Sequence, residues 1–279
     1  MKITARANFF AAALFVLCAC GSAWPAPDHI VIVVEENKSY EQIIGNSRAP
    51  YINALAKKGA LLTRSYAVAH PSQPNYLALF SGDTQGVVDD RCPVSVSGEN
   101  LASELAKKGL SFRTYSESMP STGYAGCAAG HYMRKHNPAV NWQGINVAPE
   151  MNIPFTTFKR DYSKLPTVSI VVPNQLNDMH DGEPSEAIKR GDQWLKDNID
   201  PYVKWAERHN SLLILTWDED DDTRDNHIAT IFVGPMVKRG TIDTRADHYT
   251  ILRTLIDAYG LRPISKSAAR TPIDGLWKR

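Results

Sequence analysis

Oxygen-bearing side chains gather in two short segments, each directly after an apolar run. Glu36 and Asn37 follow the first run, and the second run leads into five consecutive carboxylates, of which Asp218 and Glu219 lie nearest to it. Carboxylate and amide oxygens suit a divalent cation, and adjacent carboxylates repel one another unless a cation or open solvent relieves the repulsion. A metal site is therefore one interpretation of each segment, and a solvated turn is the alternative.

A serine stands where a helix is expected to begin. Ser72 is a good N-cap, Pro74 suits a first helical turn, and Asn75 lies three residues on, so that the hydroxyl and the amide share one face. Backbone N–H groups at a helix N-terminus attract anions, so a phosphate could rest there while the Ser72 oxygen attacks it. A serine that only caps the helix is the alternative.

Metal activation of this serine is favoured over a catalytic triad. The sequence has no Gly-x-Ser-x-Gly elbow and no evident His–Asp partner set. Two histidines, His136 and His180, sit in polar segments typical of loops, where a ligand or proton donor can be exposed. A loop histidine without other support is normally only solvated, so both need support from elsewhere.

Apolar runs that alternate with helical patterns supply the elements that would position these side chains. Strands are expected at residues 29–34, 167–172, 211–217 and 228–233. Helices are expected at residues 101–109, at 183–209 with a break near Pro201, and at 247–260 with Asp247 as the cap. This pattern predicts an α/β fold with a doubly wound, mainly parallel sheet flanked by helices, in which sites collect at the carboxyl ends of strands.

Size and charge limit the possible classes of protein. A chain of 279 residues with 43% hydrophobic content can bury one substantial core, so we expect a single domain over residues 27–279. The formal net charge is +1, which gives no indication of a polyanion binder. We therefore expect no nucleic-acid partner. No oligomeric state follows from the sequence.

The first residues have the composition of an export signal, expected over residues 1–19. Lys2 and Arg6 precede an apolar stretch that is too short to span a bilayer. The signal ends in a lipobox that would place a lipid on Cys20, and ordinary cleavage near Ala23 is the alternative. We expect a periplasmic protein, an outer-membrane lipoprotein or a secreted protein, with membrane contact only through a lipid on that cysteine.

Two cysteines remain beyond the export signal, Cys92 and Cys127. A pair of cysteines in an exported protein is expected to form a disulfide, and two free thiols are the alternative. The surrounding segment, residues 89–158, is rich in Gly, Pro, Ser and Asn and has weak periodicity. We interpret it as a long, disulfide-tied excursion beside the site.

The order of the motifs resembles the bacterial phosphoesterase family of acid phosphatases and phospholipases C, within the alkaline phosphatase superfamily. The landmarks that match, spread over nearly the whole chain beyond the signal, are Glu36-Asn37, Ser72-x-Pro-Asn75, Lys135-His136-Asn137-Pro138, Asp178-x-His180, Asp218-Glu219 and Asp247-His248-Tyr249. The resemblance implies an alkaline-phosphatase-like fold and a hydrolase that acts on phosphate esters.

The resemblance also implies a role for each matching residue. The implied ligands of one divalent metal ion are Glu36, Asn37, Ser72, Asp218 and Glu219. Ser72 is in addition the implied nucleophile, which would form a phosphoserine. The residues implied to hold the phosphoryl oxygens are Asn75, His136 and His180, with His180 preferred as the acid that protonates the leaving oxygen. Hard oxygen ligands favour calcium, magnesium or manganese over zinc.

The chain departs from the two-metal members of the superfamily. Those members carry an Asp-His pair after the late strand, where this chain has Asp218-Glu219, so one metal is expected. Asp178, His180 and His248 remain candidates for a second site, although the first two are closer in sequence than in the nucleotide pyrophosphatase branch.

The likeness is closest to small secreted acid phosphatases, some of which act on phosphoinositides. The expected substrate is therefore a phosphate monoester, either a small molecule or a lipid head group. The alternatives are a phosphodiesterase or phospholipase C and, from a different class, a non-catalytic envelope binding module.

Overall fold

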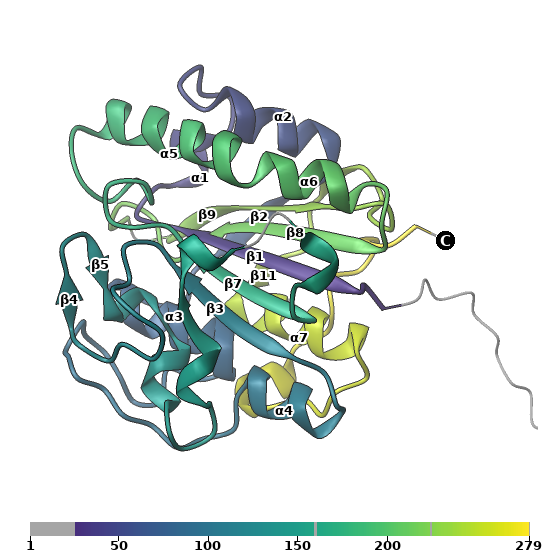
Figure 1. Cartoon of the computed structure of the whole chain (residues 1–279). Helices are drawn as coiled ribbons and strands as arrows, with labels where there is room; N and C mark the ends of the chain where they lie inside the picture. Colours follow the sequence, from purple (N-terminus) through teal and green to yellow (C-terminus); the bar gives the residue numbers. More distant parts are fainter. Residues whose placement is uncertain (1–25, 159–160, 224, 279) are drawn as a thin grey trace, which may run out of the picture.

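The computed structural model describes residues 26–158, 161–223 and 225–278 (Figure 1). The expected export signal, with Cys20 and Ala23, lies outside these residues. Within the described part of the chain, no helix has both the length and the apolar character needed to cross a membrane.

A nine-stranded sheet forms the centre of the molecule, in the order β10-β2-β9-β8-β1-β7-β3-β6, with β11 paired to β2. Its strands are β1 (His29–Glu35), β2 (Ala60–Tyr66), β3 (Phe112–Ser116), β6 (Asn152–Pro154), β7 (Val168–Val172), β8 (Ser211–Trp217), β9 (His227–Val233), β10 (Gly240–Ile242) and β11 (Ala246–Asp247). A separate small hairpin joins β4 (Ala128–Ala129) to β5 (Tyr132–Met133).

The sheet is mostly parallel, as predicted. Strand β1 runs parallel to both of its neighbours, with Ile32 opposite Ile170 of β7 and Ile214 of β8. Strand β9 runs antiparallel to β8 and to β2. Because β1, β7 and β8 point the same way, their carboxyl ends lie at one edge of the sheet, where a site was expected.

Helices cover both faces of the sheet (Figure 1). One face is covered by α1 (Tyr40–Ile43), α2 (Pro50–Lys58), α5 (Pro184–Asn198) and α6 (Asp200–Ala206), and the other by α3 (Ser72–Ser81), α4 (Leu101–Lys107) and α7 (His248–Ala258). Single 3₁₀ turns lie at Arg134–His136, Ala139–Trp142, Pro149–Met151, Phe155–Thr157, Tyr162–Lys164 and Ser265–Ala269. Alternate residues of β1 enter the two cores, Ile30 and Ile32 on one side and Val31 and Val33 on the other.

The predicted helix boundaries agree with the structure in two places. Asp247 caps α7 by accepting a hydrogen bond from the Thr250 N–H. The long helical stretch breaks at Ile199, where α5 ends and α6 begins with Pro201 in its first turn. Proline fits there because it has no N–H to lose at a helix start.

The segment 89–158 is only partly an excursion. It contains α4, β3 and β6, which belong to the main layers, and its remaining loops carry the Cys92–Cys127 disulfide, with Cα atoms 5.8 Å apart. The predicted disulfide is therefore confirmed. The helix expected at residues 101–109 is α4, whereas weak periodicity in the sequence concealed the two short strands β3 and β6.

Candidate active site

The candidate site lies at the edge of the sheet where parallel strands end. Glu36 follows β1, Asp178 follows β7, and Asp218 and Glu219 follow β8, while Ser72 opens α3 beside them. All five residues are buried. Residues from distant parts of the sequence meet here because the carboxyl ends of β1, β7 and β8 lie side by side.

Three carboxylates form a buried acidic group. Ligand oxygens of Glu36, Asp218 and Glu219 all lie within 4.8 Å of one another. Burial, together with repulsion from the other two carboxylates, raises the pKa of Asp218 well above its usual range, and burial with repulsion from Glu36 raises the pKa of Glu219 to about 7. Such a group is costly without a positive charge between its members.

Unsatisfied oxygens around this group fit a cation. Asp218 Oδ2 and the Asn37 side-chain oxygen are buried and have no hydrogen-bond partner. Asn37 turns the chain away from β1 with a positive φ of 47°, and its N–H lies 3.3 Å from Asp218 Oδ1. The three carboxylates, one of which has an orphaned oxygen, and the orphaned amide oxygen of Asn37 match the hard donor set that calcium, magnesium or manganese prefers.

The Ser72 hydroxyl points into the acidic group. Its Oγ lies 3.1 Å from Glu36 Oε2 and 3.0 Å from Glu219 Oε1, and either carboxylate can accept its hydrogen bond. The side chain does not cap the helix as expected, because Pro71 occupies the N-cap position and Ser72 is the first helical residue. The hydroxyl is thereby released from the backbone and directed at the candidate metal ligands.

The start of α3 offers fewer N–H groups to a phosphate than the sequence indicated. The Gln73 N–H donates to Asp90 Oδ1 at 2.9 Å. Pro74 has no N–H at all. Binding of a phosphate there would therefore depend more on nearby side chains than on the helix end.

Two carboxylates lie beside His136 and favour its protonated form. Its Nε2 lies 2.9 Å from Glu36 Oε1, its Nδ1 lies 3.5 Å from Asp178 Oδ2, and its ring stacks on Tyr76. Burial alone would lower the pKa of His136, but the two carboxylates outweigh burial and raise it to about 9. Burial alone would raise the pKa of Glu36, but the histidine outweighs it and lowers it to about 2.

His180 lies at the rim of the site. Its side chain is 28% exposed and its Nδ1 lies 2.8 Å from Asp181 Oδ1, while its ring centre is 6.3 Å from that of His136. Its backbone N–H donates to Asp178, whose pKa burial raises to about 6. A partly exposed imidazole can exchange protons with solvent, as a proton donor must.

The Asn75 side chain is hydrogen-bonded to backbone groups of the protein. Its side-chain oxygen accepts from the Val68 and Ala69 N–H groups, and its amide donates to the Ala69 and Pro71 carbonyls. These bonds fix the loop that connects β2 to α3. Its predicted contact with phosphoryl oxygens would require some of them to be exchanged.

The candidates for a second metal site do not assemble into a group of the same kind. His248 donates from Nε2 to the Asp218 carbonyl at 2.6 Å, and its Nδ1 is buried without a partner. Among the described residues, only Glu36, Asp218 and Glu219 form a set of three acidic, histidine or cysteine side chains with ligand atoms within 4.8 Å. Asp178, His180 and His248 are therefore not members of such a set.

Several residues that contact the site escaped the sequence-based prediction. His70 places Nδ1 2.7 Å from Glu219 Oε2, and the Tyr76 hydroxyl donates to Glu36 at 3.0 Å. Both residues lie close to Ser72 in the sequence, and this proximity could have indicated that they contact the site. Lys135 bonds to Asp90 at 2.7 Å, and nothing in the sequence links those two residues.

Comparison with known proteins gives consistent findings. The model of the phosphoesterase family matches residues 46–262. A phosphatidylinositol-3-phosphatase of Mycobacterium tuberculosis is 46% identical over 259 residues, which cover 92% of this chain and 85% of that protein. A phosphate-repressible acid phosphatase of Penicillium chrysogenum is 33% identical over 258 residues, which cover 86% of this chain and only 60% of that enzyme.

The fold also has counterparts among solved structures. A protein of the alkaline phosphatase superfamily from Vibrio parahaemolyticus superposes with a TM-score of 0.62 at 14% identity, covering 85% of this chain and 67% of that one. The similarity confirms the predicted alkaline-phosphatase-like architecture.

Proposed function

This chain belongs to the phosphoesterase family, and from that premise we propose that it hydrolyses phosphate monoesters with the help of one divalent metal ion. The observation that carries the proposal is the contact of Ser72 Oγ with Glu36 and Glu219, two of the three clustered carboxylates. The same two carboxylates contact the serine and would bind the cation, which is the arrangement that a metal-activated hydroxyl needs.

The residues that would hold the metal are Glu36, Asn37, Asp218 and Glu219, with Ser72 beside them. When bound, the metal would supply positive charge that favours the ionised serine and offsets the charge of the phosphoryl group. Glu36 and Glu219 orient the hydroxyl by accepting its hydrogen bond.

The reaction that follows is an in-line displacement. Ser72 Oγ, which has released its proton to solvent, forms a bond to phosphorus while the bond from phosphorus to the leaving oxygen breaks. His180 gives that oxygen a proton and later regains one from solvent. The protonated His136 faces the same space and offsets negative charge on the transferred group. Water then hydrolyses the phosphoserine, releases inorganic phosphate and returns the proton to Ser72.

The proposed substrates are small phosphate monoesters and phosphoinositide head groups. The relative at 46% identity is named a phosphatidylinositol-3-phosphatase, and the relative from Penicillium is named an acid phosphatase. Both names describe enzymes that remove a phosphate group from an ester, which supports the choice of monoester over diester chemistry.

The first test is turnover of a chromogenic phosphate monoester and of its diester analogue by the purified residues 27–279. Rates are measured from about pH 4 to 9, with chelator and after adding back magnesium, manganese or calcium. We expect chelator-sensitive monoester turnover and one metal per chain by elemental analysis. Turnover of the diester alone would indicate a phosphodiesterase or phospholipase C, and binding of phosphate esters without turnover would indicate a binding module.

Replacement of the nucleophile is the second test. Ser72→Ala is expected to remove turnover and leave the fold intact, because the lost oxygen is the attacking atom. Ser81→Ala is the matched control, since Ser81 lies in the same helix and bonds to the Leu77 and Asp83 carbonyls. If Ser72→Ala keeps a tenth of the wild-type rate, another residue is the nucleophile.

We also propose that the protein is exported. The disulfide between Cys92 and Cys127 supports the proposal, because such bonds persist in oxidising compartments. Fractionation of cells that produce the full chain tests it, and mass spectrometry of the mature amino terminus distinguishes a lipid on Cys20 from cleavage near Ala23. Recovery of uncleaved protein from the cytoplasm would contradict export.

A further inference from the structure

One aspartate joins two segments that carry residues of the proposed reaction. Asp90 Oδ1 accepts from the Gln73 N–H at 2.9 Å, and its Oδ2 accepts from Lys135 Nζ at 2.7 Å. Gln73 follows Ser72 at the start of α3, and Lys135 precedes His136 in a 3₁₀ turn. A single carboxylate therefore connects the backbone beside the proposed nucleophile to the turn that holds the histidine.

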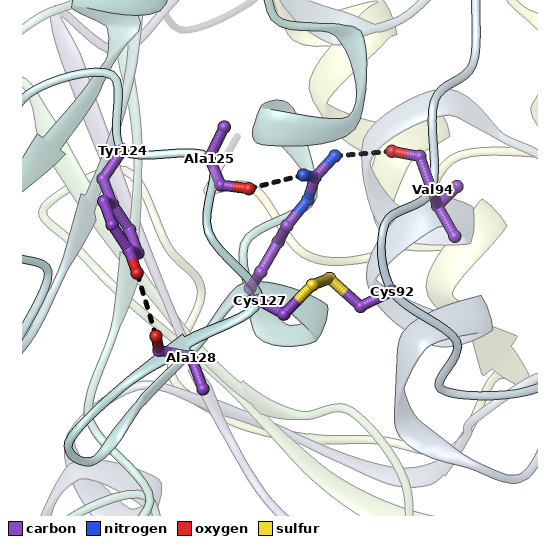
Figure 2. The surroundings of a disulfide bond; sticks show 7 residues. Cys92, Val94, Tyr124, Ala125, Cys127 and Ala128 are labelled. Carbon is purple, nitrogen blue, oxygen red and sulfur yellow. Dashed lines mark hydrogen bonds between the residues drawn. A yellow bond between two sulfur atoms is a disulfide. The ribbon is translucent and has the colours of Figure 1, made fainter.

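The disulfide between Cys92 and Cys127 joins the loop that follows this aspartate to the segment that precedes the turn (Figure 2). Cys92 lies two residues after the aspartate and is bonded to Cys127, whose carbonyl accepts the Arg134 N–H at 3.0 Å. The Arg134 guanidinium donates to the Ala125 and Val94 carbonyls, each at 2.6 Å. The loop and the turn are thus tied to each other close to the point where they contact the site.

We propose that Asp90 is a positioning residue, which sets the place of His136 relative to Ser72 through its bonds to Lys135 and Gln73. The inference rests on the proposed function, because that spacing matters only if a phosphoryl group is bound between the two residues. Asp90 itself touches none of the three clustered carboxylates, so it acts through its two partners.

A purely structural role predicts a different outcome. The Asp90 and Lys135 side chains are 29% and 18% exposed, and partly exposed ion pairs contribute little to stability. A displacement of about 1 Å within an active site, by contrast, can lower the rate about 100-fold. The proposal therefore predicts a loss of catalysis with little loss of stability.

The test compares Asp90→Ala and Asp90→Asn with Asp89→Ala. Asp89 is the matched control, because it is exposed and bonds to Arg91 within the same turn. We expect Asp90→Ala to lower kcat about 10- to 100-fold, with KM less affected and the thermal midpoint close to that of the wild type. Asp90→Asn should lose less, because its amide oxygen still accepts the Gln73 N–H.

Two further measurements separate positioning from folding. Calorimetric titration with inorganic phosphate should show weaker binding to Asp90→Ala than to the wild type, with no turnover involved. In a Lys135→Met background, Asp90→Asn should change kcat by less than about twofold, because the partner through which it acts is already lost.

The proposal is overturned if Asp90→Ala keeps the wild-type kcat and phosphate affinity, or if its loss of rate matches a loss of folded protein. If the wild-type protein neither hydrolyses monoesters nor binds phosphate, the proposed function itself fails, and this outcome differs visibly from a failure of Asp90 alone.

Discussion

Charged side chains in the site make the stability of the metal-free protein depend on pH. The pKa is raised from 4.5 to about 7 for Glu219, from 3.8 to about 6 for Asp178 and from 6.5 to about 9 for His136. At a pH between the ordinary and the raised pKa of a group, that group is protonated in the folded protein and deprotonated in the unfolded chain. Stability from these groups is therefore present at low pH and lost as the pH rises through each window.

We predict that the thermal midpoint of the protein, measured with chelator present, decreases as the pH is raised from about 5 to 9. A divalent cation should raise that midpoint more at pH 8 than at pH 5, because it binds the ionised carboxylates. Differential scanning fluorimetry with chelator and with added metal measures both effects. Glu219→Gln should flatten the slope below about pH 7, whereas Glu150→Gln, an exposed control, should not. An equal gain from metal at both pH values would contradict the prediction.

At the residue scale, the sequence predicted those site residues that directly follow strands. Glu36, Asp218 and Glu219 could be expected to meet, because parallel strands end at one edge of the sheet. The contacts of Asn75 and Asp90 could not be predicted, because they depend on how loops pack rather than on a motif.

At the scale of elements, the loop between β2 and α3 owes its shape to one side chain. The Asn75 amide makes hydrogen bonds to Val68, Ala69 and Pro71, and it is completely buried. No other position in the site makes so many bonds to backbone groups of a single loop. The placement of Ser72, the next residue after this loop, depends on them.

We predict that Asn75→Ala lowers the free energy of unfolding by about 2–4 kcal/mol, because it leaves buried backbone groups without partners. Urea unfolding measures this loss. Asn198→Ala, which removes one bond to the Trp194 carbonyl, is the control and should cost about 1 kcal/mol. If Asn75→Ala instead weakens phosphate binding and leaves stability unchanged, Asn75 contacts the phosphoryl group, as the family resemblance implies.

Strands differed in how well their sequences revealed them. The run that became β1 is buried on both faces and therefore continuously apolar, which made it easy to recognise. Strand β2 was not predicted, because Thr63 and Arg64 interrupt its apolar pattern and its register shifts between Leu62 and Ser65. A bulge of this kind breaks the alternation on which recognition depends.

At the scale of the whole molecule, the disulfide joins the loop that follows Asp90 to the segment that precedes the turn of His136. Cys92 and Cys127 are 35 residues apart in sequence. Closing a loop of that size is expected to stabilise the fold by about 3–4 kcal/mol. Breaking it should also release the segments that hold Asp90 and Arg134.

We predict that the double variant Cys92→Ser/Cys127→Ser unfolds at lower urea concentration and has a lower kcat than the wild type. Reductant should lower the stability of the wild type and leave the double variant unchanged, which makes the variant its own control. Equal stability of the two proteins under oxidising conditions would show that the bond contributes nothing to the fold.

The place of β1 in the sheet has a consequence for how the chain folds. Among the residues that the structure describes, β1 is the first strand in sequence and one of the innermost, and its two partners begin only at Val168 and Ser211. Both of its edges stay open until most of the polypeptide has been made, so folding depends on slow, non-local closure rather than on growth from one end. A nascent chain that ends before Ser211 lacks Asp218 and Glu219 as well, so the proposed metal site can form only when closure is complete. Until then, the uncovered strand is the part of the chain that a chaperone would need to shield.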